Sequence, residues 1–217
     1  MIAAGAPTAA DVTLSAHGLK CVRGGRTLIE GLELTVEPGR PVHLLGVNGS
    51  GKTTLLRTLA SLRPPEAGQI RWGGRPVERV RPEFLQAMAY VGHAPGLKQD
   101  LTARENLAAG LALAGRAPVE SIPAALAAVG LRRLADRPVR RLSAGQARRV
   151  ALAGLRLTTA RLWILDEPFT ALDADGRELI RDLLIQHCDR GGLAVLTSHQ
   201  AIDFGPLPVA EMRLGAA

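Results

Sequence analysis

One short stretch constrains the fold of this chain more than any other: the apolar residues 41–45, which lead directly into a glycine-rich turn. The turn consists of Gly46, Val47, Asn48, Gly49, Ser50, Gly51, Lys52, Thr53 and Thr54. Glycine tolerates positive φ, so successive backbone N–H groups of such a turn can point inward at an anion. A strand that enters the turn and a helix that leaves it therefore predict a phosphate-binding loop rather than a chance glycine-rich turn.

Two side chains of this loop carry specific predicted roles. Lys52 brings a positive charge to the β and γ phosphates, and Thr53 opens a helix whose N-terminal dipole favours negative charge. The Thr53 hydroxyl is placed to ligate a Mg²⁺ that bridges the same phosphates. The residues that we expect to hold the nucleotide here are Gly46, Asn48, Gly49, Ser50, Gly51, Lys52, Thr53 and Thr54.

Composition limits which partners and which metal sites the chain can have. The chain has 217 residues and a formal net charge of +7, which is compatible with nucleic acid, an anionic membrane surface or nucleotide as partner, and equally with a solvated basic surface. The two cysteines, Cys21 and Cys188, are expected to be small buried residues, since they lack the spacing of metal ligands. The five histidines are scattered, and none forms a pair at helical ligand spacing.

No apolar run approaches the roughly 18 residues that cross a bilayer, and the longest candidate is Leu107 to Gly115. The segment Met1 to Ala10 lacks the basic start of a secretory signal. We therefore expect a cytosolic protein with a short frayed tail.

The pattern of the chain predicts an α/β fold. Val12 to Lys20 and Leu28 to Val36 alternate apolar and polar residues, which predicts an antiparallel layer. Further expected strands are 68–72, 89–92, 162–165 and 193–197, and expected helices are 54–62, 84–88, 142–157 and 179–187. Residues 101–134, rich in Ala and Leu, predict two or three more helices. We thus expect one domain over 1–217, a mostly parallel sheet with polar residues at its strand ends, and a helical subdomain inserted at about 93–157.

Two carboxylates follow the apolar strand at 162–165. Asp166 can hold Mg²⁺, usually through water, and Glu167 can orient or deprotonate the water that attacks the γ-phosphate. A strand-terminal acidic pair that merely stays solvated is the alternative, disfavoured by the presence of the loop lysine.

The order of these motifs resembles the ATP-binding-cassette ATPases. The matching residues are Leu142, Ser143, Ala144, Gly145 and Gln146, then Leu165, Asp166, Glu167 and Pro168, then Ala171, Leu172 and Asp173, with His199 where that family has its switch histidine. The resemblance covers nearly the whole chain.

This resemblance implies a head-to-tail pair of chains with two ATP molecules between them. Ser143, Gly145 and Gln146 of a second copy would complete the γ-phosphate site, and Asp173 would cross the interface. Lys52, Glu167 and His199 would be the catalytic residues, and His199 would contact the γ-phosphate of its own chain.

Two positions depart from the family pattern. His93 stands where the family has a glutamine, and its imidazole can donate to water or coordinate the metal. Arg23 stands where an aromatic side chain commonly stacks on adenine, and a guanidinium plane can stack on a base as well.

The segments 90–98, 142–152 and 162–173 are similar to the heme exporter ATP-binding subunits of bacterial cytochrome c biogenesis. This similarity implies a peripheral ATPase at the cytoplasmic face of the bacterial inner membrane, which binds ATP and Mg²⁺. We expect it to dock on integral membrane subunits through residues 93–105. We expect no direct binding of nucleic acid. The alternatives are the ATPase of another transporter, a soluble nucleic-acid-associated cassette protein, and a module that holds ATP without cleaving it.

Overall fold

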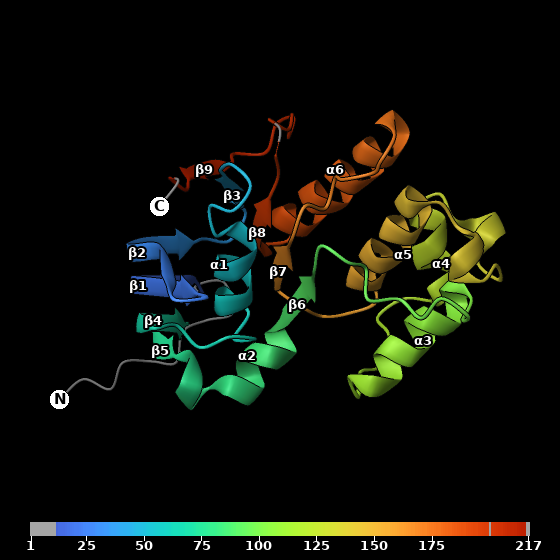
Figure 1. Cartoon of the computed structure of the whole chain (residues 1–217). Helices are drawn as coiled ribbons and strands as arrows, with labels where there is room; N and C mark the ends of the chain where they lie inside the picture. The colour runs from blue at the N-terminus through green and yellow to red at the C-terminus, as the bar shows by residue number, and fades with distance from the viewer. Residues whose placement is uncertain (1–11, 200, 216–217) are drawn as a thin grey trace.

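The computed structural model of the chain describes residues 12–199 and 201–215. Within them, two β-sheets lie on one side and a group of helices lies on the other (Figure 1). The tail predicted at residues 1–10 lies outside the described residues. Across the described ranges, no helix combines the length and the apolar character needed to cross a membrane.

The larger sheet is parallel and has the strand order β6-β7-β8-β3-β9. Its strands are β3 (Val42–Leu45), β6 (Met88–Val91), β7 (Leu162–Leu165), β8 (Leu193–Thr197) and β9 (Ala210–Arg213). Every residue of β7 and β8 is buried, as is typical of parallel strands covered on both faces. Because all five strands run the same way, the polar residues that follow β3, β7 and β8 meet at one edge of the sheet.

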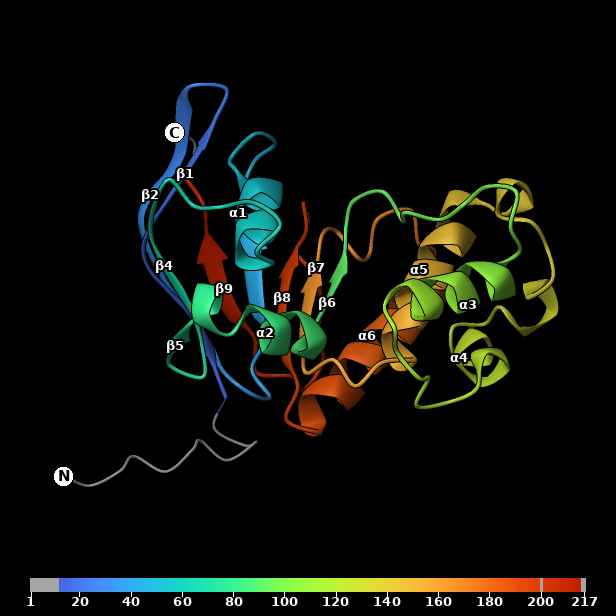
Figure 2. The same cartoon turned by 90° about the horizontal axis from the view of Figure 1, so that it is seen from below.

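The smaller sheet is antiparallel, with the order β2-β1-β4-β5. Its strands are β1 (Leu14–Arg23), β2 (Arg26–Val36), β4 (Ala67–Trp72) and β5 (Arg75–Pro76). Helix α1 (Lys52–Leu59) lies between the two sheets (Figure 2). Its buried residues Leu55, Leu56 and Leu59 join one hydrophobic core with residues of both sheets, so the strand and helix that flank the phosphate loop are both fixed by packing.

The remaining helices are α2 (Arg81–Ala87), α3 (Ala103–Leu113), α4 (Ile122–Ala128), α5 (Ala144–Arg156) and α6 (Ala174–Asp189), with short 3-10 turns at Val77–Arg79, Arg132–Leu134 and Val139–Arg141. Helices α3, α4 and α5 lie together, away from the antiparallel sheet (Figure 1). A second core cluster runs without a break from Ala103 in α3 to Leu196 in β8. Because this one cluster joins the helices to the parallel sheet, it does not mark where a helical subdomain begins or ends. The predicted subdomain boundaries at 93 and 157 therefore stay a prediction.

The structure confirms the predicted fold class, the antiparallel layer and the strands at 162–165 and 193–197. Both cysteines are buried and unpaired, as predicted. Several predicted boundaries are wrong by two residues or more, among them those of three helices. Helix α1 ends at Leu59, not Leu62, because the chain turns at Ser61 with φ 55°. Helix α2 begins three residues earlier than predicted, and α6 begins at Ala174, where Asp173 caps it. The strands β5 and β9 were not predicted, because both are short and lack an apolar run.

Candidate functional site

The phosphate loop leaves β3 and turns into α1 through two glycines in the left-handed region, Gly49 at φ 85° and Gly51 at φ 96°. Lys52 begins the helix and is 6% exposed. Its ammonium donates to the carbonyl oxygens of Gly46 at 2.6 Å and Val47 at 3.1 Å. The lysine is therefore held against its own loop, with its charge at the positive end of the α1 dipole.

Asp166 and Glu167 follow β7, as predicted, and a threonine at the end of β8 links them. The Thr197 hydroxyl donates to Asp166 Oδ1 at 2.9 Å and accepts the backbone N–H of Glu167 at 2.9 Å. Glu167 has φ 54°, a conformation rare for a residue other than glycine. Strained backbone of this kind clusters at functional sites, and here the Thr197 hydroxyl helps to hold it.

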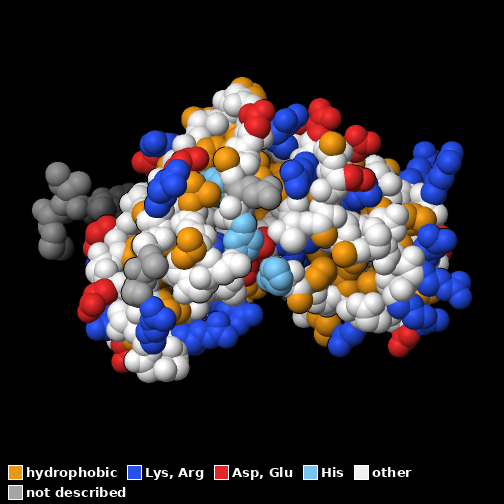
Figure 3. Space-filling view, turned by 45° about the horizontal axis from the view of Figure 1, so that its top comes forward, with side chains coloured by type: hydrophobic (Ala, Val, Ile, Leu, Met, Phe, Trp, Pro, Cys, Tyr) orange, Lys and Arg blue, Asp and Glu red, His pale blue; other side chains and the backbone are white. Residues whose placement is uncertain are grey.

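Two histidines face the carboxylate of Glu167. His199 Nε2 contacts Oε1, and His93 Nδ1 lies 3.8 Å from Oε2. The Thr170 hydroxyl donates to Oε2 at 3.1 Å. The Glu167 side chain is 9% exposed, whereas the two histidines are 42% and 67% exposed. The arrangement places one shielded base beside two exposed groups that can donate hydrogen bonds. Figure 3 shows histidine surface around a small acidic area in the hollow of this face.

The guanidinium of Arg148, on α5, joins the helical part to these strand ends. It donates to the carbonyl oxygens of Gly92 at 2.6 Å, His93 at 3.2 Å and Glu167 at 2.7 Å, and also to that of Asp166. Burial lowers the pKa of Arg148, while the charges of Asp166 and Glu167 raise it. The carbonyls on both sides of the site thus share one buried cation.

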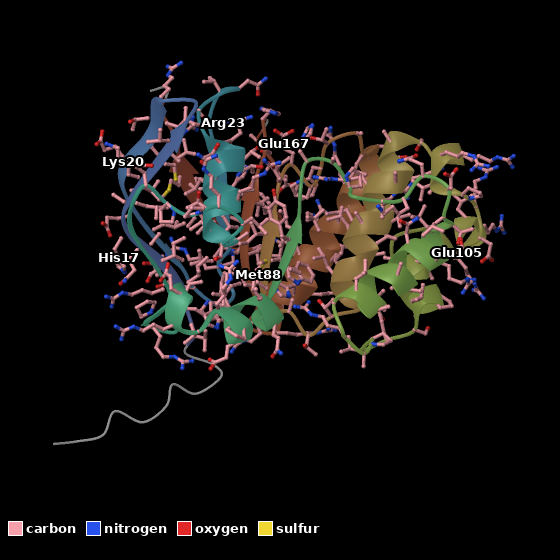
Figure 4. All side chains as sticks on the ribbon, turned by 60° about the horizontal axis from the view of Figure 1, so that its bottom comes forward. His17, Lys20, Arg23, Met88, Glu105 and Glu167 are labelled. Carbon is pink, nitrogen blue, oxygen red and sulfur yellow. The ribbon has the colours of Figure 1, made fainter. Side chains whose placement is uncertain are left out.

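A cavity of about 380 Å³ gathers most of the predicted nucleotide residues. Of the predicted site residues, its lining contains Arg23, Asn48, Gly49, Gly51, Lys52, Thr53, Thr54, His93, Glu167 and His199. Gly46 and Ser50 lie in the loop without lining the cavity. Figure 4 shows Arg23 and Glu167 at the same edge of the molecule, near the start of α1, and Glu105 at the far end of the helical part.

The residues predicted to act on a second copy also lie outside this cavity: Ser143, Gly145, Gln146 and Asp173. Ser143 caps α5 in a capping box with Gln146. A Cβ on Gly145 would lie 2.4 Å from the carbonyl oxygen of Ala171, so the start of α5 is packed tightly on the segment that leads to Asp173. One chain therefore places these residues away from its own phosphate loop.

The buried carboxylate of Asp166 fits a magnesium ion. Asp166 is 1% exposed, and its Oδ2 is buried without a hydrogen-bond partner among the described residues. A buried carboxylate oxygen without a partner is costly unless something else satisfies it, and Mg²⁺ prefers such oxygen ligands. The Thr53 hydroxyl, at the start of α1, and the His93 imidazole are the other ligands predicted for this ion, and both line the cavity.

Sequence reasoning missed Thr197, Thr170 and the role of Arg148. A threonine that ends an apolar strand carries no local signal of its own, because β-branched residues are common in strands. An arginine within the apolar periodicity of α5 is a usable signal, since arginine is almost never fully buried unless it is paired.

The comparisons agree with this geometry. Residues 29–170 match the family model described as ABC transporter. The chain is 51% identical over 194 residues to the cytochrome c biogenesis ATP-binding export protein CcmA of Methylococcus capsulatus, covering 89% of this chain and 94% of that protein. It is 49% identical over 202 residues to CcmA of Pseudomonas putida, covering 93% and 96%.

Among solved structures, a putative ABC transporter ATP-binding protein from Pyrococcus furiosus superposes with a TM-score of 0.80 at 25% identity, covering 93% of this chain and 97% of that one. The family match, the phosphate loop and the strand-end carboxylates all indicate the same family of ATP-binding proteins. The chain belongs to the ABC transporter family, among its ATP-binding proteins that resemble CcmA.

Proposed function

We propose that this chain is the ATP-hydrolysing subunit of the membrane complex that exports heme for cytochrome c biogenesis. The observation that carries the proposal is the shielded Glu167 carboxylate, which shares one cavity with Lys52 and the two histidines. The identity of about half the residues to CcmA proteins supports the cytochrome c branch.

In this proposal Lys52 and the N–H groups of residues 46–54 hold the β and γ phosphates of ATP. Thr53 and Asp166 would hold Mg²⁺, which supplies charge neutralisation between those phosphates. Arg23 stacks on the base. Glu167 orients a water molecule towards the γ-phosphate and accepts its proton, while His199 holds the carboxylate in place and donates to the phosphate. The products are ADP and phosphate.

A second copy of the chain completes the site. Ser143 and Gly145 stand at the start of α5, where a hydroxyl and backbone N–H groups can bind a γ-phosphate. They lie outside the cavity of their own chain, so the proposal assigns them to the phosphate of a partner copy in a head-to-tail pair.

The integral membrane subunits bind on the helical side. A groove of about 700 Å³ is lined by residues 88–98 together with α3 and the C-terminal half of α5. Its lining is mostly apolar, and Leu113 at its edge is 89% exposed. Large exposed apolar groups mark interaction sites, and a segment of the membrane subunits is the occupant that fits an export protein. The chain then lies at the cytoplasmic face of the bacterial inner membrane.

Two experiments test the proposal. The tagged chain is purified from membranes and its partners are identified. The same chain is also expressed in cells that lack it, and cytochrome c maturation is measured. The expected result is co-purification with membrane proteins of cytochrome c biogenesis and restored maturation. Lys52→Ala and Glu167→Gln should still co-purify but should not restore it. Co-purification with another transporter, or with nucleic acid in a salt-sensitive manner, would contradict the proposal.

A further inference from the structure

One buried polar side chain beside the site has no part in the chemistry above. His43 lies in β3, three residues before the phosphate loop, and is 0% exposed between the apolar neighbours Val42 and Leu44. Burying a polar group without a partner costs free energy. A histidine in a central parallel strand therefore needs a specific contact.

His43 has two such contacts, and both lie in the segment that carries His199. Its Nε2 is 2.7 Å from the hydroxyl oxygen of Ser198. Its ring packs edge-on against Phe204, with centroids 5.1 Å apart. Ser198 precedes His199 directly and Phe204 follows five residues after it, so one imidazole touches the chain on both sides of the histidine that faces Glu167.

The sheet register explains why these residues meet. His43 pairs with Leu196 across the parallel strands β3 and β8. Side chains alternate along a strand, so Ser198, two residues beyond Leu196, points to the same face as His43. The register thus brings Ser198, the first residue after β8, to His43, while Phe204 reaches the ring from the segment that follows.

The protonation of His43 follows from its surroundings. Nδ1 is buried without a partner in the described part of the chain, so a proton there would be an orphan donor. The proton therefore belongs on Nε2, which donates to the Ser198 oxygen. Burial lowers the pKa of His43, and Glu211 on β9 opposes this only partly, in keeping with a neutral ring.

We infer that His43 is a positioning residue for ATP hydrolysis: it fixes Ser198 and Phe204 so that His199 stays in contact with Glu167. It touches neither the nucleotide cavity nor the reacting atoms. The inference rests on ATP hydrolysis by this chain and adds a residue to the machinery that performs it.

The test measures steady-state ATP hydrolysis by the chain, purified with its membrane partners, for Ser198→Ala, His43→Leu and His43→Gln. Loss of one buried hydrogen bond should lower kcat by roughly tenfold in Ser198→Ala and His43→Leu. The KM for ATP should stay within about twofold, because the phosphate loop is untouched. Glutamine can still donate from its amide, so His43→Gln should keep most of the wild-type kcat. The double variant Ser198→Ala with His43→Leu should lose no more than either single one.

His187→Gln is the matched control. His187 is a second, part-buried histidine near the opposite end of β8, stacked on Trp163 and hydrogen-bonded to the Leu193 carbonyl oxygen at 3.1 Å. This variant should lower thermal stability and leave kcat unchanged. An unchanged kcat in Ser198→Ala would overturn the inference. So would decreases in kcat that are proportional to the decreases in melting temperature across all four single variants. Absence of hydrolysis by the wild-type chain would instead count against the proposed function.

Discussion

The guanidinium of Arg148 donates a hydrogen bond of 2.7 Å to the carbonyl oxygen of Glu167, which ties helix α5 to the residue proposed as the catalytic base. The same guanidinium serves three further carbonyl oxygens. The start of α5, where we propose that a partner's phosphate binds, and the proposed base at the end of β7 are thus joined by one buried side chain.

Arg148→Met should therefore destabilise the fold strongly. It leaves four carbonyl oxygens without this donor, and buried groups left unpaired cost on the order of 3 kcal/mol in total after relaxation. Urea unfolding measures the loss. The neighbouring Arg149→Met is the control, because within residues 12–199 and 201–215 Arg149 donates to a single carbonyl oxygen, that of Val129 at 3.2 Å. Equal losses in the two variants would contradict the role given to Arg148.

Thr197→Val should lower kcat while ATP still binds. Valine keeps the shape of the side chain but removes the hydroxyl that serves Asp166 and the Glu167 N–H. We expect a loss of roughly tenfold or more, since the Asp166 carboxylate and the Glu167 backbone N–H both lose a fixed partner. Thr197→Ser restores the hydroxyl and should recover most of kcat. Unchanged hydrolysis at saturating ATP in Thr197→Val would show that the bridge has no part in positioning.

How far the sequence determines this site differs from residue to residue. The loop around Lys52 and the strand-end pair Asp166 and Glu167 were predictable, because glycines, a lysine and carboxylates at fixed places beside apolar strands carry local signals. The contacts of Arg148 and Thr197 were not. The position of Arg148 in the apolar periodicity of α5 signals that it is buried and paired, but no local pattern says which segments the fold brings to either side chain. Distant pairs such as Thr197 and Glu167 meet only through sheet order, which no local pattern encodes.

The pH dependence of stability should contain a contribution from His187. Burial lowers the pKa of His187 from 6.5 to about 4. The unfolded chain then binds the proton more readily, so this contribution is fully present above about pH 6.5 and is lost as the pH falls towards 4. Its size is up to about 3 kcal/mol. Urea unfolding between pH 7.5 and 4.5 should show a flatter profile for His187→Gln than for wild type. Parallel profiles would contradict the burial of a neutral ring.

Two glycines of α5 should respond oppositely to alanine. At Gly154 a Cβ would meet only Leu107 Cδ2 at an ordinary 3.5 Å, so Gly154→Ala should raise the free energy of unfolding by about 0.5–1 kcal/mol through helix propensity. At Gly145 a Cβ would lie 2.4 Å from the Ala171 carbonyl oxygen, so Gly145→Ala must move the start of α5 and should destabilise the fold. Urea unfolding distinguishes the two, and stabilisation by Gly145→Ala would contradict the close packing.

We propose that ATP binding and pairing of two chains are one event. Glu167→Gln keeps the shape of the proposed base but removes its charge, so bound ATP should persist. Light scattering of this variant should give the 22.9 kDa of one chain without nucleotide or with ADP, and twice that mass with ATP and Mg²⁺. The double variant Glu167→Gln with Ser143→Arg should still bind ATP but should keep the mass of one chain. A Glu167→Gln chain that holds one ATP per chain and keeps the mass of one chain would show that ATP binding does not require pairing.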